Sequence, residues 1–258
     1  MYKRVDYPKE NDLVICTVKE ISDMSVKVSL DEFENFKGII PIDELSNKRV
    51  TNPRIIVKEN EKIVCMVLDI DKDNRLAVLS LKRVDKNKQK AKILEYKREI
   101  SAYNVIKIMS ERENIDIKEL EKEIVFKIVP EEKLYKVFLD AYINGKEVLE
   151  KYKIKKKYIN KLYEYIIENL NPTKYRFEYI LEAYNIEGDG ILKLKNFLME
   201  IKNLNLEIKY LGSPRYSIRY TSYSPKDLQN MEKKLLQTIE QAAKKYNIIY
   251  EIKKNEGN

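Results

Sequence analysis

Short clusters of basic residues are the parts of this 258-residue chain best suited to bind a ligand. KNKQKAK covers residues 86–92, and KYKIKKKYINK covers residues 151–161. Such clusters either follow the phosphates of a nucleic acid, releasing counterions, or form a solvated protein surface. The second cluster is the better candidate for phosphate binding because tyrosines interleave it. Its central lysines are Lys155, Lys156 and Lys157.

Residue patterns typical of catalysis and metal binding are missing from the sequence. The chain has no histidine, the commonest general base at neutral pH. It also lacks the Gly-x-x-x-x-Gly-Lys phosphate loop and the Gly-x-Ser-x-Gly nucleophile turn. Cys16 and Cys65 occupy inward positions of predicted strands, so we expect them to be buried free thiols. We therefore expect no enzymatic activity, no metal and no cofactor.

Residues 1–85 are predicted to fold as a small β-barrel. Apolar residues recur at every second position in short runs bounded by charged turns, as is typical of half-buried strands. Five such strands fit an OB-type barrel. The outward positions of the second strand hold Ser25, Lys27 and Ser29, so the aromatic platform on which many such barrels stack a base is missing. Lys27 either binds a phosphate or is a solvated lysine.

The longest connection in the predicted barrel covers residues 47–61 and carries several basic side chains. Connections of this length in a compact domain are usually functional or mobile. Lys48, Arg49 and Arg54 are therefore candidates for contact with RNA or with a ribosome.

Residues 86–172 are predicted to form an all-helical domain. Asp85 is a plausible N-cap, and the apolar period of three to four residues predicts a long helix to about Glu111. Pro130 suits the first turn of a third helix. This segment holds 20 basic and 15 acidic residues, whereas residues 1–85 hold 15 basic and 16 acidic residues. The excess positive charge of the chain, +8 in total, therefore lies outside the barrel.

Residues 173–258 are predicted to adopt the ferredoxin-like order β-α-β-β-α-β. In that topology the turns at 188–190 and 212–214 lie at the same end of the sheet. A helix cap and a hairpin explain their glycines structurally, but this end of the sheet is also a candidate docking patch for a partner protein. The docking candidates are Gly190, Tyr210, Leu211, Arg215 and Tyr216.

Two motifs in the barrel resemble the S1-type RNA-binding domain. Asp71, Arg75, Leu79 and Ser80 closely match its Asp-x-x-x-Arg-x-x-Leu-Ser pattern, and the resemblance makes Asp71 and Arg75 candidates for RNA binding. Its Gly-x-x-Pro-x-x-Glu-Leu-Ser pattern is matched by Gly38, Pro41, Glu44, Leu45 and Ser46.

The order of barrel, helical domain and ferredoxin-like domain resembles the archaeal type of the alpha subunit of translation initiation factor 2. The most specific matches are LSLKRVDKNKQKAKILEYKR at 79–98 and YLGSPRYSI at 210–218. The resemblance implies a non-catalytic subunit of a heterotrimer that delivers methionylated initiator tRNA to the small ribosomal subunit, dependent on GTP. It also implies that a GTP-binding gamma subunit docks on residues 173–258 and links the chain to a beta subunit.

A stand-alone RNA-binding or ribosome-associated protein with an S1 domain is the alternative function. The neutral barrel and the missing aromatic platform disfavour it. We expect the chain to be cytoplasmic, because its N-terminal segment lacks a signal-peptide core and no apolar run approaches the roughly 18 residues needed to span a membrane.

The family resemblance also bears on regulation. Eukaryotic members carry a phosphorylated serine in the barrel, and if it is placed a few residues after the Glu-Leu-Ser segment it falls on Asn52. Asparagine cannot accept phosphate, so we expect no phosphorylation at that position.

Overall fold

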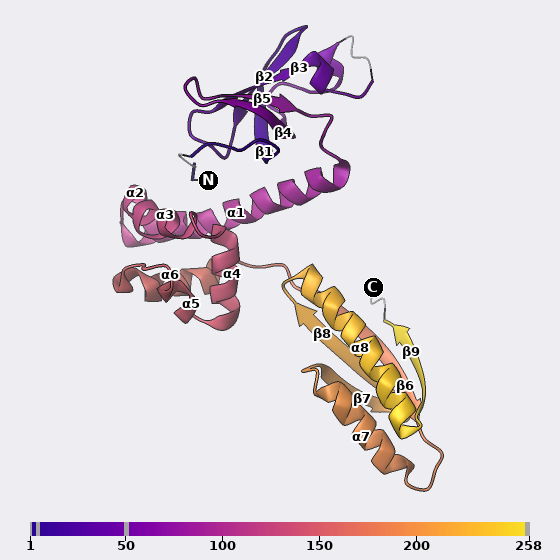
Figure 1. Ribbon diagram of the computed structural model, residues 1–258. Helices are drawn as coiled ribbons and strands as arrows, with labels where there is room; N and C mark the ends of the chain where they lie inside the picture. Colours follow the sequence, from indigo (N-terminus) through magenta and orange to yellow (C-terminus); the bar gives the residue numbers. More distant parts are fainter. Residues whose placement is uncertain (1, 4–5, 49–51, 256–258) are drawn as a thin grey trace. The chain divides into compact units, whose positions relative to one another are not determined.

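The structure is a computed structural model that describes residues 2–3, 6–48 and 52–255. The chain forms two compact units, Met1–Asn171 and Pro172–Asn258 (Figure 1). The first unit contains a closed five-stranded barrel followed by helices, and the second contains a four-stranded sheet with two long helices. This architecture confirms the predicted fold class, an S1-type OB barrel followed by a helical domain and a ferredoxin-like domain.

The barrel closes in the strand order β1-β2-β3-β5-β4. Neighbouring strands are antiparallel except β3 and β5, which run parallel. Alternate side chains point inward and form one core, which includes Cys16 and Cys65 as buried free thiols, as predicted. The strands are β1 (Leu13–Ile21), β2 (Ser25–Leu30), β3 (Lys37–Pro41), β4 (Lys62–Asp71) and β5 (Leu76–Ser80), with the 3₁₀ turn η1 (Ile42–Glu44) after β3.

Gly38 of the first S1-like motif is required by packing inside the barrel. A Cβ atom at this position would lie 2.4 Å from Cδ1 of Leu79, closer than non-bonded carbon atoms approach. The end of the same motif is tied to the chain after β5, because the backbone N–H groups of Leu81 and Lys82 donate to the Glu44 carbonyl at 2.9 and 3.0 Å. The chain segments that carry the two S1-like motifs therefore contact each other directly.

The connection at 47–61 is anchored to the barrel over its described part. It contains a 3₁₀ turn, η2 (Pro53–Ile55), which Asn52 caps by accepting a hydrogen bond of 3.0 Å from the Arg54 backbone N–H. Val57 is buried in the barrel core. The length of this segment predicts a functional or mobile connection, and its described part is packed on the barrel.

The long helix α1 (Lys86–Glu113) begins where the sequence predicts. Oδ1 of Asp85 accepts hydrogen bonds of 2.9 Å from the backbone N–H groups of Asn87 and Lys88, which have no partner within the helix. The predicted N-cap is thus confirmed.

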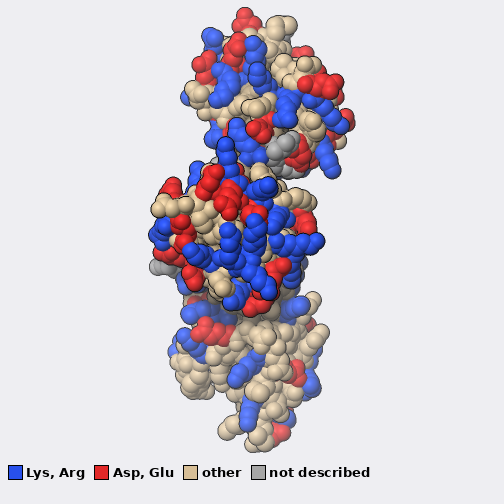
Figure 2. All heavy atoms as spheres, turned by 90° about the vertical axis from the view of Figure 1, so that its left-hand side faces the viewer, with Lys and Arg blue, Asp and Glu red and all other residues tan. Residues whose placement is uncertain are grey.

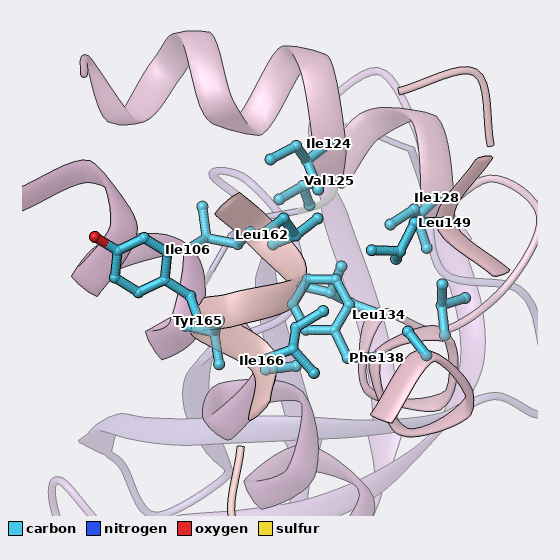
Figure 3. Packing of buried hydrophobic residues seen from close by; sticks show 14 of the residues in the cluster. Ile106, Ile124, Val125, Ile128, Leu134, Phe138, Leu149, Leu162, Tyr165 and Ile166 are labelled. Atoms are coloured by element: carbon cyan, nitrogen blue, oxygen red, sulfur yellow. The ribbon is translucent and has the colours of Figure 1, made fainter. Parts of the chain in front are cut away.

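The helices after the barrel enclose a second core of the first unit. Side chains such as Ile106, Phe138 and Leu162 interlock in its centre (Figure 3). Besides α1, this part comprises α2 (Ile117–Leu120), the π-helical turn η3 (Glu121–Val125), α3 (Phe126–Ile128), α4 (Leu134–Asn144), α5 (Glu147–Glu150) and α6 (Lys156–Asn169).

Pro130 does not begin a helix, contrary to the prediction. It lies in the turn that follows α3, and α4 starts only at Leu134. Because proline has no N–H to donate, it suits the turn after a helix as well as a first helical turn.

The second unit is a sheet in the order β7-β8-β6-β9 with both long helices on one face (Figure 1). Its core combines Phe177 and Leu181 of β6 with Phe197 of α7 and Leu235 of α8. This is the predicted ferredoxin-like arrangement. The elements are β6 (Tyr175–Tyr184), α7 (Gly190–Lys202), β7 (Glu207–Gly212), β8 (Arg215–Ser222), α8 (Pro225–Tyr246) and β9 (Ile249–Lys254).

Candidate nucleic-acid interface

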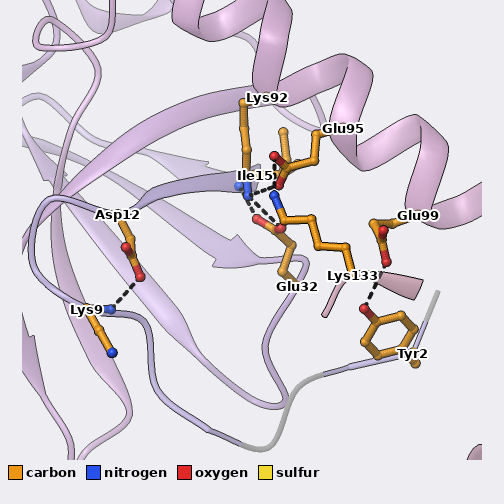
Figure 4. Close-up of polar contacts among 9 residues, drawn as sticks. All are labelled: Tyr2, Lys9, Asp12, Ile15, Glu32, Lys92, Glu95, Glu99 and Lys133. Carbon is orange, nitrogen blue, oxygen red and sulfur yellow. Dashed lines mark hydrogen bonds and ion pairs between the residues drawn. The ribbon is translucent and has the colours of Figure 1, made fainter. Parts of the chain in front are cut away.

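A largely buried ion pair fastens α1 to the barrel (Figure 4). Nζ of Lys92 lies 2.8 Å from Oε1 of Glu32, after β2, and 3.3 Å from Oε1 of Glu95. The other oxygen of Glu32 accepts a hydrogen bond of 3.0 Å from the Ile15 backbone N–H in β1. Burial alone would lower the pKa of Lys92, but the two carboxylates outweigh it and the pKa is raised. Lys92, the last lysine of the first basic cluster, therefore holds the unit together.

A second contact brings the segment before β1 onto the helical core. Tyr2 is buried, its ring centroid lies 5.9 Å from that of Tyr103, and its hydroxyl donates to Oε2 of Glu99 at 3.1 Å (Figure 4). Oε1 of Glu99 accepts a hydrogen bond of 3.1 Å from the Tyr135 backbone N–H. Burial raises the pKa of Glu99 in spite of these hydrogen bonds. Tyr2 thus belongs to the helical core although it precedes the barrel in the sequence.

Two of the RNA-binding candidates on the barrel already have partners within the chain. Nζ of Lys27 lies 2.9 Å from Oε2 of Glu20 on the neighbouring strand β1. Asp71 accepts hydrogen bonds from the side chain and the backbone N–H of Asn74 at 2.7 and 3.1 Å, which lower its pKa. Asp71 therefore shapes the turn between β4 and β5.

The remaining barrel candidates differ in how freely they face solvent. Lys48 and Arg54 are exposed. Arg75 is half-buried, and its Nη1 donates to the Glu34 carbonyl at 2.7 Å. Arg49 lies outside the described residues. Among these described candidates, Lys48 and Arg54 are therefore more open to solvent than Arg75.

The second basic cluster contributes to an exposed face of the helices on which lysines and carboxylates are mixed (Figure 2). Nζ of Lys155 lies 2.8 Å from Oε1 of Glu123, and Nζ of Lys127 lies 2.9 Å from Oε2 of the same carboxylate. Hydrogen bonds from these two ammonium groups lower the pKa of Glu123 to about 2. Part of the local positive charge is thus balanced by an acid from a neighbouring helical turn.

The other two lysines of the triplet at 155–157 are less tightly paired. Nζ of Lys157 lies 3.6 Å from Oε1 of Glu119 and 4.4 Å from the ring centroid of Tyr158. Lys156 is exposed, and among the described residues no carboxylate lies within ion-pair distance of it. Lys156 is therefore the member of this triplet most available to an external phosphate.

The second unit carries an apolar groove between α7 and the edge strand β7. Its volume is about 440 Å³, and Leu198, Ile208 and Tyr216 line it. At its rim, Ile191 is 85% exposed and Tyr210 is 65% exposed. Large apolar side chains this open to solvent are typical of a surface that a partner covers.

The predicted docking residues lie around this groove in different ways. Tyr210 and Tyr216 line it, with ring centroids 5.6 Å apart. Leu211 and Arg215 are exposed at the hairpin beside it. Gly190 is buried at the start of α7, where a Cβ atom would lie 2.8 Å from the Asn185 carbonyl oxygen, so its role is in packing.

Family comparisons agree with this architecture. A model of the S1 RNA binding domain matches residues 7–82, and a model of the eukaryotic translation initiation factor 2 alpha subunit matches residues 118–224. Translation initiation factor 2 subunit alpha from Archaeoglobus fulgidus is 32% identical over 249 residues, which cover 94% of this chain and 92% of that relative. The chain belongs to the family of translation initiation factor 2 alpha subunits.

This alpha subunit is also similar to another archaeal relative and to two solved structures. The Thermococcus onnurineus alpha subunit is 32% identical over 253 residues, covering 93% of this chain and 91% of the relative. The crystal structure of the intact alpha subunit of aIF2 from Pyrococcus abyssi superposes with a TM-score of 0.64 at 25% identity, covering 97% of this chain and 99% of that one. A chain of the a/eIF2alpha-aDim2p-rRNA complex from Pyrococcus horikoshii superposes with a TM-score of 0.60 at 30% identity. The match covers 63% of this chain and 97% of that one.

Sequence patterns missed two features of this alpha subunit. One is Tyr2 in the helical core, where a short segment without periodicity gives no signal. The other is the open apolar face of α7, whose spacing in the sequence does not distinguish Ile191 at the surface from Ile201 in the core. No helix within the described ranges is both long and apolar enough to cross a bilayer.

Proposed function

We propose that this chain acts as the non-catalytic alpha subunit of a heterotrimer that brings methionylated initiator tRNA to the small ribosomal subunit in the cytoplasm, dependent on GTP. The observation that carries the proposal is the identity of 32% to the Archaeoglobus fulgidus alpha subunit over nearly the whole of both chains. In this assignment GTP is bound by a separate gamma subunit, and the alpha subunit adds binding surfaces.

The C-terminal unit is proposed to dock on the gamma subunit and, through it, to join the beta subunit. The groove beside α7 supports this role, because Ile191, Leu198 and Tyr210 present an apolar surface that water does not favour. Leu211 and Arg215 beside the groove would extend the contact at the hairpin.

The N-terminal unit is proposed to contact initiator tRNA and the small ribosomal subunit. The match to the S1 RNA binding domain supports this, as does the presence of ribosomal RNA in the complex that contains the Pyrococcus horikoshii relative. Exposed cations that make no ion pair within the described ranges, above all Lys156, Lys48 and Arg54, are the residues proposed to meet phosphates.

Initiator-tRNA affinity tests the proposal directly. The cognate gamma subunit, loaded with a non-hydrolysable GTP analogue, is measured alone, with the full chain, and with the compact unit 172–258 only. The full chain should co-purify with gamma and tighten tRNA binding, whereas the isolated unit should co-purify without tightening it. If neither form associates with gamma, the proposed assembly is wrong and a stand-alone RNA-binding role takes its place.

A further inference from the structure

Tyr7 is an exposed aromatic residue fixed at the edge of the barrel. Its side chain lies before β1, is 41% exposed, and packs edge-on against Phe36 with ring centroids 6.3 Å apart. Phe36 is buried and packs in turn on Phe33 at 6.3 Å, and the next residue in the chain, Pro8, is buried as well. The Tyr7 ring therefore packs on buried residues while part of its surface stays open.

Two cations flank this ring. Nζ of Lys72 lies 5.9 Å and the guanidinium carbon of Arg75 lies 6.0 Å from the Tyr7 ring centroid. Arg75 is held in position, because its Nη1 donates to the Glu34 carbonyl at 2.7 Å. Within the described ranges, no carboxylate lies at ion-pair distance from either cation. Their positive charge is thus available to a ligand, unlike that of Lys27.

A partly open ring beside uncompensated cations has the chemistry of a single-strand binding site. Bases stack on aromatic side chains, and neighbouring cations bind the phosphates on either side. The second strand of this barrel offers no aromatic residue for stacking, since its outward positions are Ser25, Lys27 and Ser29. Tyr7 supplies such a residue from outside the strands.

We propose that Tyr7 stacks on an unpaired base of a single-stranded RNA, with Lys72 and Arg75 meeting the flanking phosphates. This inference rests on the proposed RNA-binding function and identifies the residue on which an unpaired base stacks. The groups beside the ring are cations, so they favour a polyanion with flat bases over an apolar protein side chain.

Binding of labelled oligouridine to the full chain tests this site. Fluorescence anisotropy gives the affinity for a single strand and for an RNA duplex of the same length at one fixed salt concentration. Tyr7→Ala should weaken single-strand binding by about tenfold and leave duplex binding unchanged, because stacking needs an unpaired base. Tyr7→Phe should bind like the wild type. Tyr184→Ala, which removes a ring that is 45% exposed on the other unit, is the matched control.

Salt dependence separates stacking from charge. Lys72→Gln should reduce the slope of log affinity against log salt by about 0.7, the value for one phosphate contact on a single strand, whereas Tyr7→Ala should keep the wild-type slope. The stacking site is overturned if the wild type does not bind oligouridine, if Tyr7→Ala binds it as tightly as wild type, or if duplex binding falls equally. The initiator-tRNA affinity of the gamma subunit with the wild-type chain is measured separately. The heterotrimer function can therefore be tested even if Tyr7 does not bind a base.

Discussion

The hydroxyl of Tyr2 donates a hydrogen bond of 3.1 Å to Oε2 of Glu99, a residue 97 positions later in the chain. Both side chains are buried, so water cannot replace the bond without opening the helical core. This contact fixes the segment before the barrel to the helical core, and the ion pair between Lys92 and Glu32 fastens α1 to the barrel itself. The first unit should therefore resist deformation at the start of α1.

Removing the Tyr2 ring should destabilise the first unit. We expect Tyr2→Ala to reduce the free energy of unfolding by about 3 kcal/mol, because a buried aromatic ring is lost. Tyr2→Phe should cost about 1 kcal/mol, since only the hydrogen bond is removed. Urea denaturation followed by circular dichroism measures both, with Tyr184→Phe as the exposed control. Wild-type stability of Tyr2→Ala would show that the ring is not packed in the core.

Glu99 should make the stability depend on pH in a defined direction. Burial raises the folded pKa of Glu99 above its usual 4.5, so its contribution is fully present below that value and is lost as pH rises through the folded pKa. The stability of the wild type relative to Glu99→Gln should therefore fall as the pH rises above the usual pKa of 4.5 and through the raised folded pKa. Thermal unfolding of both proteins at each pH tests this. A constant difference would contradict the raised pKa.

The pair between Lys92 and Glu32 should behave as a coupled unit. The two side chains are only 14% and 13% exposed, so Lys92→Met leaves a poorly solvated carboxylate and should cost about 3 kcal/mol. The double variant Lys92→Met/Glu32→Gln should recover much of that loss, because no unpaired charge remains. A double-mutant cycle by urea denaturation gives the coupling free energy. Additive single effects would mean that the pair is not formed in solution.

Neutralising Glu123 should strengthen RNA binding by the helical face. The pKa of Glu123 is about 2, so at neutral pH it is charged and occupies Lys155 and Lys127. Glu123→Gln frees both lysines, and the slope of log tRNA affinity against log salt should steepen by about 0.9 for each new phosphate contact.

A charge-matched control separates this local effect from net charge. Glu168→Gln removes the same charge from an exposed pair with Arg112, at 2.9 Å, and should change tRNA affinity less. Equal effects of Glu123→Gln and Glu168→Gln would assign the gain to net charge alone.

Charged substitutions in the apolar groove should release the gamma subunit. Ile191→Asp and Tyr210→Asp place a carboxylate where the proposed contact is apolar, and each should weaken gamma binding by about tenfold or more. Ile55→Asp, at a residue 81% exposed on the barrel unit, is the control. Pull-down with the cognate gamma subunit measures the effect. Unchanged retention of both groove variants would direct the search for the docking surface elsewhere on the C-terminal unit.

The elements of this protein could be predicted from the sequence where their determinants are local. Asp85 caps α1 through hydrogen bonds to residues immediately after it, and strand alternation depends on nearest neighbours. Pro130 was misplaced because the residue is compatible with both the start of a helix and the turn after one. Local chemistry alone could not decide between them.

The candidate site could be predicted only in part, because its character depends on residues distant in sequence. The run around Lys155 is plainly basic in the sequence, but the carboxylate of Glu123 that balances it comes from another helical turn. Tyr7 has no periodic context, and only the fold brings Lys72 and Arg75 beside it. Long-range pairing of this kind leaves no local pattern to recognise.

The long separation between Tyr2 and Glu99 also fixes an order of events during synthesis. A ribosome makes Tyr2 before any of the helical core exists, whereas the strands of the barrel, which end at Ser80, are complete before Glu99 is made. The barrel can therefore close while the Tyr2 side chain still lacks its pocket. Closing so long a loop costs chain entropy, so we expect this contact to form late in maturation of the nascent chain.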